Sequence, residues 1–202
     1  MDVAVHITQQ VEADALLSRS ALAVLVGALL DWQVPSEWAF AQPAVIARRL
    51  GGEDLDTHRI AQHDPAHLAA LFAAPPAVHD SPALMARRVQ ELCRHLVARH
   101  DGRAAAVWEQ AATGRELYRR INELPGFGRQ KSQIFVALLG KQYGVRPDGW
   151  REAAGAYGED GVHRSVADVT GPESLEKVCA HRQEVRRAAK ESKVRPAEHH
   201  HL

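Results

Sequence analysis

The segment LPGFGRQK, residues 124–131, has the residue types best suited to bind a phosphate. Its two glycines permit a tight turn and a close approach to the backbone, and Arg129 and Lys131 add charge where a helix is expected to begin. The first amides of a helix are free to donate hydrogen bonds to an anion. A glycine-rich corner between two helices explains the same residues equally well. From the residues alone, both interpretations stay open.

Histidines and cysteines are the other residues that could perform chemistry. His58, His63 and His67 are spaced as zinc ligands can be, but Pro65 interrupts the helix that would bring the last two together. We therefore expect no zinc site. The two cysteines of the chain are too few to hold zinc or an iron–sulfur cluster unaided, and they are typical of a reducing compartment.

Proline and glycine divide the chain into helical segments, and no alternating strand pattern of useful length is present. We expect an all-α fold in which Ala21–Leu30 is a buried central helix and Ser36 or a neighbour caps a short one. The expected helices cover about residues 11–30 with a break near 18–20, 43–52, 65–74, 81–102, 114–122, 129–144 and a basic stretch from about 172.

The composition agrees with an all-α fold and bears on where in the cell we expect the protein. Hydrophobic residues make up 46% of the 202 residues and aromatic residues only 5%, which favours helices over sheets. No run approaches the ~20 apolar residues of a membrane span, and no secretory signal is visible. We expect a cytoplasmic, nucleoid-associated protein with no membrane partner, and we set aside the terminal EHHHL, which could be a tag remnant.

Charge is balanced overall but divided unevenly along the chain. Residues 1–110 hold 9 Lys/Arg against 13 Asp/Glu, and residues 111–202 hold 16 against 12, so the two parts carry about −4 and +4. The basic part is consistent with a local phosphate-binding face, although a solvated charged surface explains it almost as well.

Three motifs resemble the endonuclease III superfamily of base-excision DNA glycosylases. LPGFG between two helices resembles its helix-hairpin-helix, and GVRPD, Gly144 to Asp148, resembles its Gly/Pro-rich loop with an essential aspartate. Gln130 stands at the position of the family's catalytic lysine, and Asp148 follows it after the matching 18 residues. LLDWQVPSEW, Leu29 to Trp38, resembles the family's Leu-Leu-x-x-Gln segment. The resemblance covers about residues 16–157, and the phrases LLDWQVP and RSVADVTGPESL are similar to a small actinobacterial branch.

The resemblance implies an all-α, two-lobed fold with DNA in the cleft between the lobes. A six-helix lobe would span residues 16–142 and include the hairpin at 124–128. Residues 1–15 and 143–202 would form the second lobe, with the aspartate loop and the basic C-terminal helix. The partner would be double-stranded DNA with a damaged or mismatched base, bound by a monomer.

Catalysis, by the same resemblance, would depend on Asp148, whose carboxylate would stabilise the oxocarbenium-like transition state of N-glycosidic cleavage. Its alternative role is to cap the helix beginning at GWREAAG. Gln130 cannot form a Schiff base, so we expect a monofunctional hydrolase. Lys131 is turned by about 100° from Gln130 on a helix, and we expect it to point away from the pocket toward a phosphate. A lyase working through Lys131 is an alternative.

The remaining site residues also follow from the resemblance. Trp32, Trp38 and Tyr143 are candidates for the base pocket, with packing in the core as their alternative, and Gln33 would fill the gap left by the everted base. A monovalent cation, Na⁺ or K⁺, could bind the main-chain carbonyls of Asn122, Leu124 and Phe127. The DNA-contacting residues would also include the hairpin and the residues just after it: Leu124, Pro125, Gly126, Gly128, Arg129 and Lys131.

The family's C-terminal iron–sulfur cluster has no cysteines here, so we expect no cofactor. In its place stands a basic helix with Arg182, Arg186, Arg187 and Lys190, which could contact DNA or only solvate the surface. Two rival functions stay open besides the lyase. One is a non-enzymatic DNA-binding module in which Asp148 is only a cap, and the other is a helical protein-interaction domain.

Overall fold

A computed structural model describes residues 3–194, with side chains up to residue 191. Within these residues the chain is helical and contains no β-strand, and one isolated bridge joins Thr113 to Asp148. The predicted all-α class is therefore confirmed. The histidines at 199–201 lie outside the described residues. The elements are α1 Val11–Arg19, α2 Ala21–Leu30, α3 Ser36–Arg49, α4 Thr57–Gln62, α5 Pro65–Ala73, α6 Pro82–His100, α7 Ala106–Glu109, α8 Gly114–Asn122, α9 Arg129–Gln142, α10 Trp150–Ala154, η1 Gly155–Gly158, η2 Val166–Asp168 and α11 Pro172–Val194.

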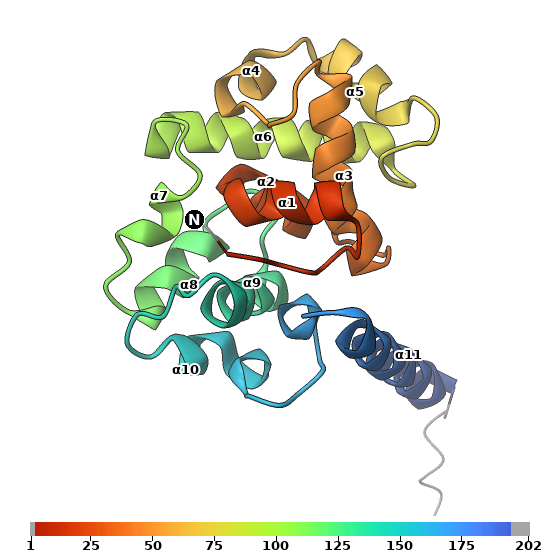
Figure 1. Ribbon diagram of the computed structural model, residues 1–202, viewed down its shortest axis with the longest axis vertical. Coiled ribbons are helices and arrows are strands. Elements are labelled where there is room, and N and C mark those ends of the chain that lie inside the picture. Colours follow the sequence, from red (N-terminus) through yellow and green to blue (C-terminus); the bar gives the residue numbers. More distant parts are fainter. Residues whose placement is uncertain (1–2, 195–202) are drawn as a thin grey trace, which may run out of the picture.

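Helix α2 is the centre of the fold (Figure 1). Every residue from Leu22 to Leu30 is buried, as expected for the most apolar segment of the chain. The helix begins at Ser20, whose hydroxyl accepts a hydrogen bond from the amide of Ala23 at 3.2 Å. In the described part of the chain, no single helix is long and apolar enough to cross a bilayer; α1 and α2 pass that test only as a pair, bent by 117°.

Helix α3 corrects two expectations about its region. It runs unbroken from Ser36 to Arg49 with Pro43 inside it, although the sequence predicts that Pro43 begins a helix. Pro43 cannot donate to the carbonyl one turn earlier, but the apolar face of α3 packs along α2, and this burial outweighs one lost hydrogen bond. Ser36 is not a cap either, because Pro35 is the N-cap and the Ser36 hydroxyl donates to Asp31.

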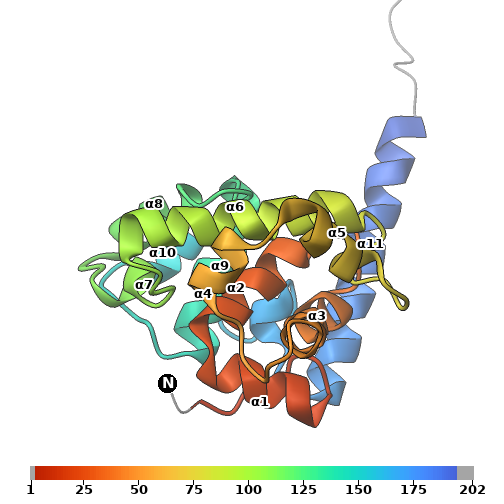
Figure 2. The same cartoon turned by 90° about the horizontal axis from the view of Figure 1, so that it is seen from above.

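The other helices pack on two sides of this centre (Figures 1 and 2). Helices α4 and α5 pack on α6, while α8, α9 and α10 pack on one another on the far side of α2. The buried apolar side chains form one continuous core from Val5 to Ala167. Helix α11 contacts this body near η2 and then extends beyond it (Figure 2). The short elements α4, α7, η1 and η2 were not expected, since helices this short show no clear periodicity. The helix expected at GWREAAG is present as α10.

Candidate functional site

The hairpin between α8 and α9 has the geometry expected for LPGFG. Gly126 has φ +82° at the turn, and the amide of Phe127 donates to the carbonyl of Leu124 at 3.1 Å. Leu124 and Phe127 are buried, so they anchor the turn to the core. Gly128, by contrast, has an ordinary φ of −96° and open space beside its α-carbon. The exposed face of the turn therefore lies at Gly128 and the residues that follow.

The first turn of α9 is open to solvent on one side. Arg129 and Gln130 are exposed, and no side chain among residues 3–191 caps the helix. The first backbone bond into the helix is donated by the amide of Ser132, to Gly128, so the amides before it are free for an anion. Gln130 donates from Nε2 to the hydroxyl of Tyr157 at 2.8 Å, which fixes its side chain toward the segment after α10.

Asp148 lies next to this hairpin. Its main-chain carbonyl accepts a hydrogen bond from the amide of Gly114 at 2.7 Å, which ties it to the start of α8. Its side chain is exposed and makes no hydrogen bond in the described part of the chain. Gly149, not Asp148, is the N-cap of α10, so the capping role is wrong. A shallow hollow lined by Asp148, Arg129 and Gln133 leaves the carboxylate free to face a ligand.

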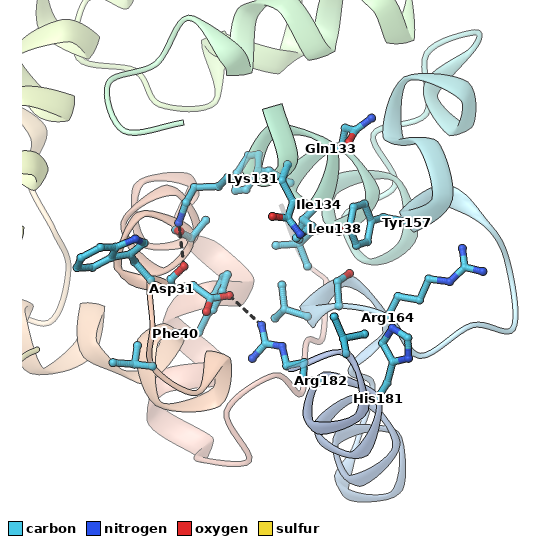
Figure 3. A pocket seen from close by; sticks show the side chains of 18 of the residues that line it. Asp31, Phe40, Lys131, Gln133, Ile134, Leu138, Tyr157, Arg164, His181 and Arg182 are labelled. Atoms are coloured by element: carbon cyan, nitrogen blue, oxygen red, sulfur yellow. Dashed lines mark hydrogen bonds and ion pairs between the residues drawn. The ribbon is translucent and has the colours of Figure 1, made fainter. Parts of the chain in front are cut away.

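A larger cavity of about 500 Å³ lies beside this hollow, and Gln133 lines both. Three parts of the chain form its walls (Figure 3): the segment after α2, the N-terminal half of α9, and the residues from η1 to α11. Its floor is apolar, with Phe40, Ile134 and Leu138. Polar groups reach it from all three walls. A cavity of this volume can hold a nucleobase.

Lys131 does not point away from the cavity, contrary to our expectation. It lines the cavity and directs Nζ at the end of α2, where it donates to the carbonyls of Ala28, Leu29 and Asp31. The last carbonyls of a helix lack intrahelical donors and carry partial negative charge, so they attract an ammonium group. The side chain therefore ties the start of α9 to the segment that carries Trp32 and Gln33.

Burial lowers the pKa of Lys131 to about 8 from its ordinary value of 10.5, with Asp31 opposing the shift and Arg88 adding to it. The buried charge therefore costs stability below pH 8, and this cost disappears between pH 8 and 10.5 as the folded protein loses the proton first. Across this window we expect wild type to gain about 1–3 kcal/mol of unfolding free energy relative to Lys131→Met. Denaturant titrations of both proteins at several pH values measure this difference, and parallel curves would contradict the burial of the charge.

The segment after α2 is held by a histidine that the sequence analysis missed. His79 is buried, its Nε2 lies 3.0 Å from the carbonyl of Trp32, and its Nδ1 accepts from the amide of Ser81 at 3.0 Å. Because Nδ1 accepts, Nε2 must carry the proton and donate to Trp32. The ring also stacks on Trp32, with centroids 6.3 Å apart. A lone histidine in a loop gave no signal of this role.

Trp32 and Gln33 are the exposed tip of this segment. Trp32 lines the cavity, is 37% exposed and has the guanidinium of Arg88 5.3 Å from its ring. Gln33 is exposed, lines the same cavity and has φ +62°. A glutamine in the left-handed region is uncommon and costs about 1 kcal/mol. The surrounding contacts of His79 and Lys131 hold it there.

The opposite wall depends on the C-terminal end of α9. Lys141 forms an ion pair with Asp168 at 2.5 Å, and the side chain of Asp168 is only 4% exposed. Asp168 also accepts from the amides of Arg164 and Ser165. Gln142 adds hydrogen bonds to three main-chain carbonyls between 166 and 169. Helix α9 thus positions one cavity wall with each of its ends.

Helix α11 closes the cavity from the side. Arg182 contacts the hydroxyl of Ser36 and lies 3.4 Å from the carboxylate of Asp31, so it bridges α11 to the segment after α2 (Figure 3). Arg186 also lines the cavity. Arg187 and Lys190 are exposed. Arg182 and Arg186 therefore line the cavity, although Arg186 is also exposed to solvent, and Arg187 and Lys190 lie outside the lining.

Two of the aromatic residues predicted for the base pocket, Tyr143 and Trp38, lie elsewhere. Tyr143 is buried and donates its hydroxyl to the carbonyl of Leu17 at 3.1 Å, and burial raises its pKa. Trp150 is also buried. Trp38 lines a separate hollow together with Asp80 and packs on His79. Of the predicted pocket residues, the structure brings only Trp32 to the cavity.

Among the residues that the structure describes, no three His, Cys, Asp or Glu side chains lie close enough together to hold a metal ion. The rings of His63 and His67 do stack, with centroids 5.0 Å apart, although Pro65 begins a new helix between them. At the hairpin, the carbonyl of Leu124 accepts from Phe127 and retains a second lone pair.

Comparison with known proteins adds no relative, since no family model matches the chain and no curated protein or solved structure is significantly similar.

Proposed function

We propose that this protein is a monofunctional DNA glycosylase of base-excision repair. The observation that carries the proposal is the meeting of two separate motifs at one cavity. Gln130 and Lys131 follow the hairpin, Trp32 and Gln33 follow α2, and all four line the same space. Nearly a hundred residues separate the two motifs in the sequence.

The hairpin would hold DNA by its phosphates. Arg129 and the free amides of the first turn of α9 offer charge and donors on an exposed surface. Gly128 leaves room for a phosphate to approach. Contacts of this kind carry no sequence information and weaken with salt. We expect one protein molecule to bind one duplex, in a cleft between a lobe of residues 16–142 and a lobe of residues 1–15 and 143–202.

Base flipping would use the tip after α2. A base leaves the duplex at a cost of a few kcal/mol, and a side chain that fills the gap offsets part of this cost. Gln33 is exposed at the cavity edge in a backbone conformation set before DNA arrives. Trp32 lines the cavity and would border the flipped base. The cavity of about 500 Å³ would then receive the base.

Hydrolysis would take place at the boundary of the cavity and the hollow of Asp148. Water attacks C1′ of the sugar, the C1′–N bond breaks, and the base leaves with the bonding electrons. The exposed carboxylate of Asp148 would stabilise the positive charge that develops on the sugar and accept the proton from water. Gln130 has no amine for a Schiff base. A monovalent cation on the carbonyls of Asn122, Leu124 and Phe127 would support the hairpin.

Strand cleavage through Lys131 is the alternative that the cavity raises, because this amine lines it. Nζ, however, donates to three carbonyls at the end of α2, so the amine would have to leave these contacts before it could attack the sugar. We expect borohydride to trap no covalent complex between wild type and a duplex with an abasic site. A trapped complex that disappears in Lys131→Met would contradict the monofunctional mechanism and establish a lyase.

A further inference from the structure

The charges that line the cavity are predominantly positive. Lys131, Arg182 and Arg186 contribute positive charge, and Asp31 is the only carboxylate among the described residues of the lining. The Asp31 side chain already accepts from Ser36 and pairs with Arg182. Arg164 also lines the cavity, but it pairs with Glu159 outside it, at 2.9 Å. No free carboxylate therefore faces a ligand inside the cavity.

Of these positive groups, the guanidinium of Arg186 has the fewest opposite charges near it. Over the described side chains it forms no ion pair, whereas Arg187, its neighbour on α11, pairs with Glu191 at 3.6 Å. Lys131 adds a charge that is mostly present at pH 7, since its pKa is about 8. A ligand in the cavity is thus exposed to an unbalanced positive potential. Partial burial strengthens the contribution of Lys131 relative to water, whereas Arg186 is exposed to solvent.

The surroundings of the Trp32 ring also disfavour a cationic base. Cations are often bound over the face of a tryptophan, but the ring of Trp32 already has the guanidinium of Arg88 5.3 Å from its centroid and His79 stacked on it. A second cation on this ring would meet the charge of the first. Side-chain donors near the cavity, from Gln33, Gln130 and Arg186, instead suit carbonyl oxygens.

We infer that the cavity accepts an uncharged or anionic base rich in carbonyl oxygens and rejects a cationic, alkylated base. This inference rests on the proposed function, because it assumes that the cavity receives a flipped base. The carboxylate of Asp148 does not alter this preference for an uncharged or anionic base. That carboxylate lies in the adjoining hollow, where it would act on the sugar and not on the base.

The test compares three purines of similar size and different charge in one duplex sequence. Each duplex carries a single 2′-fluoro nucleotide, which prevents excision, with xanthine, hypoxanthine or 7-methylguanine. Near pH 6.5 these bases are mainly anionic, neutral and cationic, respectively. Dissociation constants are measured at one salt concentration against the same duplex with 2′-fluoro guanine. We expect xanthine to bind about tenfold more tightly than 7-methylguanine, with hypoxanthine between them.

Two substitutions on α11 test whether the preference among the three bases arises in the cavity. Arg186→Gln should reduce the ratio of xanthine to 7-methylguanine affinity about threefold. Arg187→Gln changes the same charge on the same helix outside the cavity lining and should leave the ratio unchanged. Equal effects of the two variants, or equal binding of the three purines, would overturn the inference.

Failure of this inference differs from failure of the proposed function. Tighter binding of 7-methylguanine, with excision of that base from an ordinary duplex, would overturn the charge preference and leave the glycosylase intact. No preference for any of the three bases over guanine would overturn the inference alone. The proposed function fails only if no base in a broad panel of damaged or mismatched duplexes is excised.

Discussion

Replacing Gly126 with alanine is expected to destabilise the protein by about 2–5 kcal/mol, whereas Gly128→Ala should change stability by less than about 1 kcal/mol. Gly126 has φ +82°, and an added Cβ would lie 2.4 Å from Cδ1 of Leu29 in the core helix α2. Both the backbone and the core would have to shift. Gly128 has an allowed φ and nothing within 4 Å of an added Cβ. Denaturant unfolding measures both changes.

Among variants that fold, Gly128→Ala should have the larger effect on DNA binding, although it has the smaller effect on stability. A methyl group at Gly128 would stand where a phosphate approaches the first amides of α9, so we expect Gly128→Ala to weaken duplex binding about tenfold and to reduce its salt dependence. The variant is informative because its fold should be intact. If Gly128→Ala binds DNA as wild type does, the hairpin is not the phosphate site, and a structural corner explains its glycines.

Asp168→Ala is expected to lower the free energy of unfolding by about 3–5 kcal/mol. The Asp168 side chain is 4% exposed and that of Lys141 is 13% exposed, so the alanine variant leaves a buried ammonium without its partner. The amides of Arg164 and Ser165 also lose their acceptor. These amides belong to the loop that forms one cavity wall, so ligand binding at the cavity should weaken together with stability.

A matched control separates burial from charge in this prediction. Asp160 pairs with Arg151 at 2.6 Å, but both side chains are largely exposed, 73% and 46%. Solvent screens such a pair, and Asp160→Ala should leave the unfolding transition nearly unchanged. Similar losses in the two variants would show that the ion pair of Asp168 is not the buried contact described above.

Much of the fold could be predicted because proline and glycine mark its helix ends. The limits of α8 and the starts of α9 and α11 follow from Gly114, the hairpin and Pro172. Pro43 misled the prediction, since packing of α3 along α2 overrides a local signal. The short elements α4, α7, η1 and η2 were missed, because one or two turns give no periodicity.

The candidate site could be predicted where a local motif forms it and not where distant contacts do. The hairpin and the exposed Asp148 come from contiguous motifs. The position of Lys131 depends on the end of α2, about a hundred residues away, which the helical rotation from Gln130 does not reveal. The same holds for His79, which fixes Trp32, and for Tyr143, whose partner is Leu17. An aromatic residue beside a motif is as often core as pocket.

The most direct test of the central claim is a panel of duplexes, each with one damaged or mismatched base, incubated with wild type and with Asp148→Asn. Strand breaks are read before and after alkali. Glu152→Gln serves as the control, because Glu152 is an exposed carboxylate in the same hollow. We predict alkali-dependent cleavage of at least one lesion, reduced at least about a hundredfold by Asp148→Asn and retained by Glu152→Gln. Binding of the duplexes without excision of any base would contradict the glycosylase and leave a DNA-binding module.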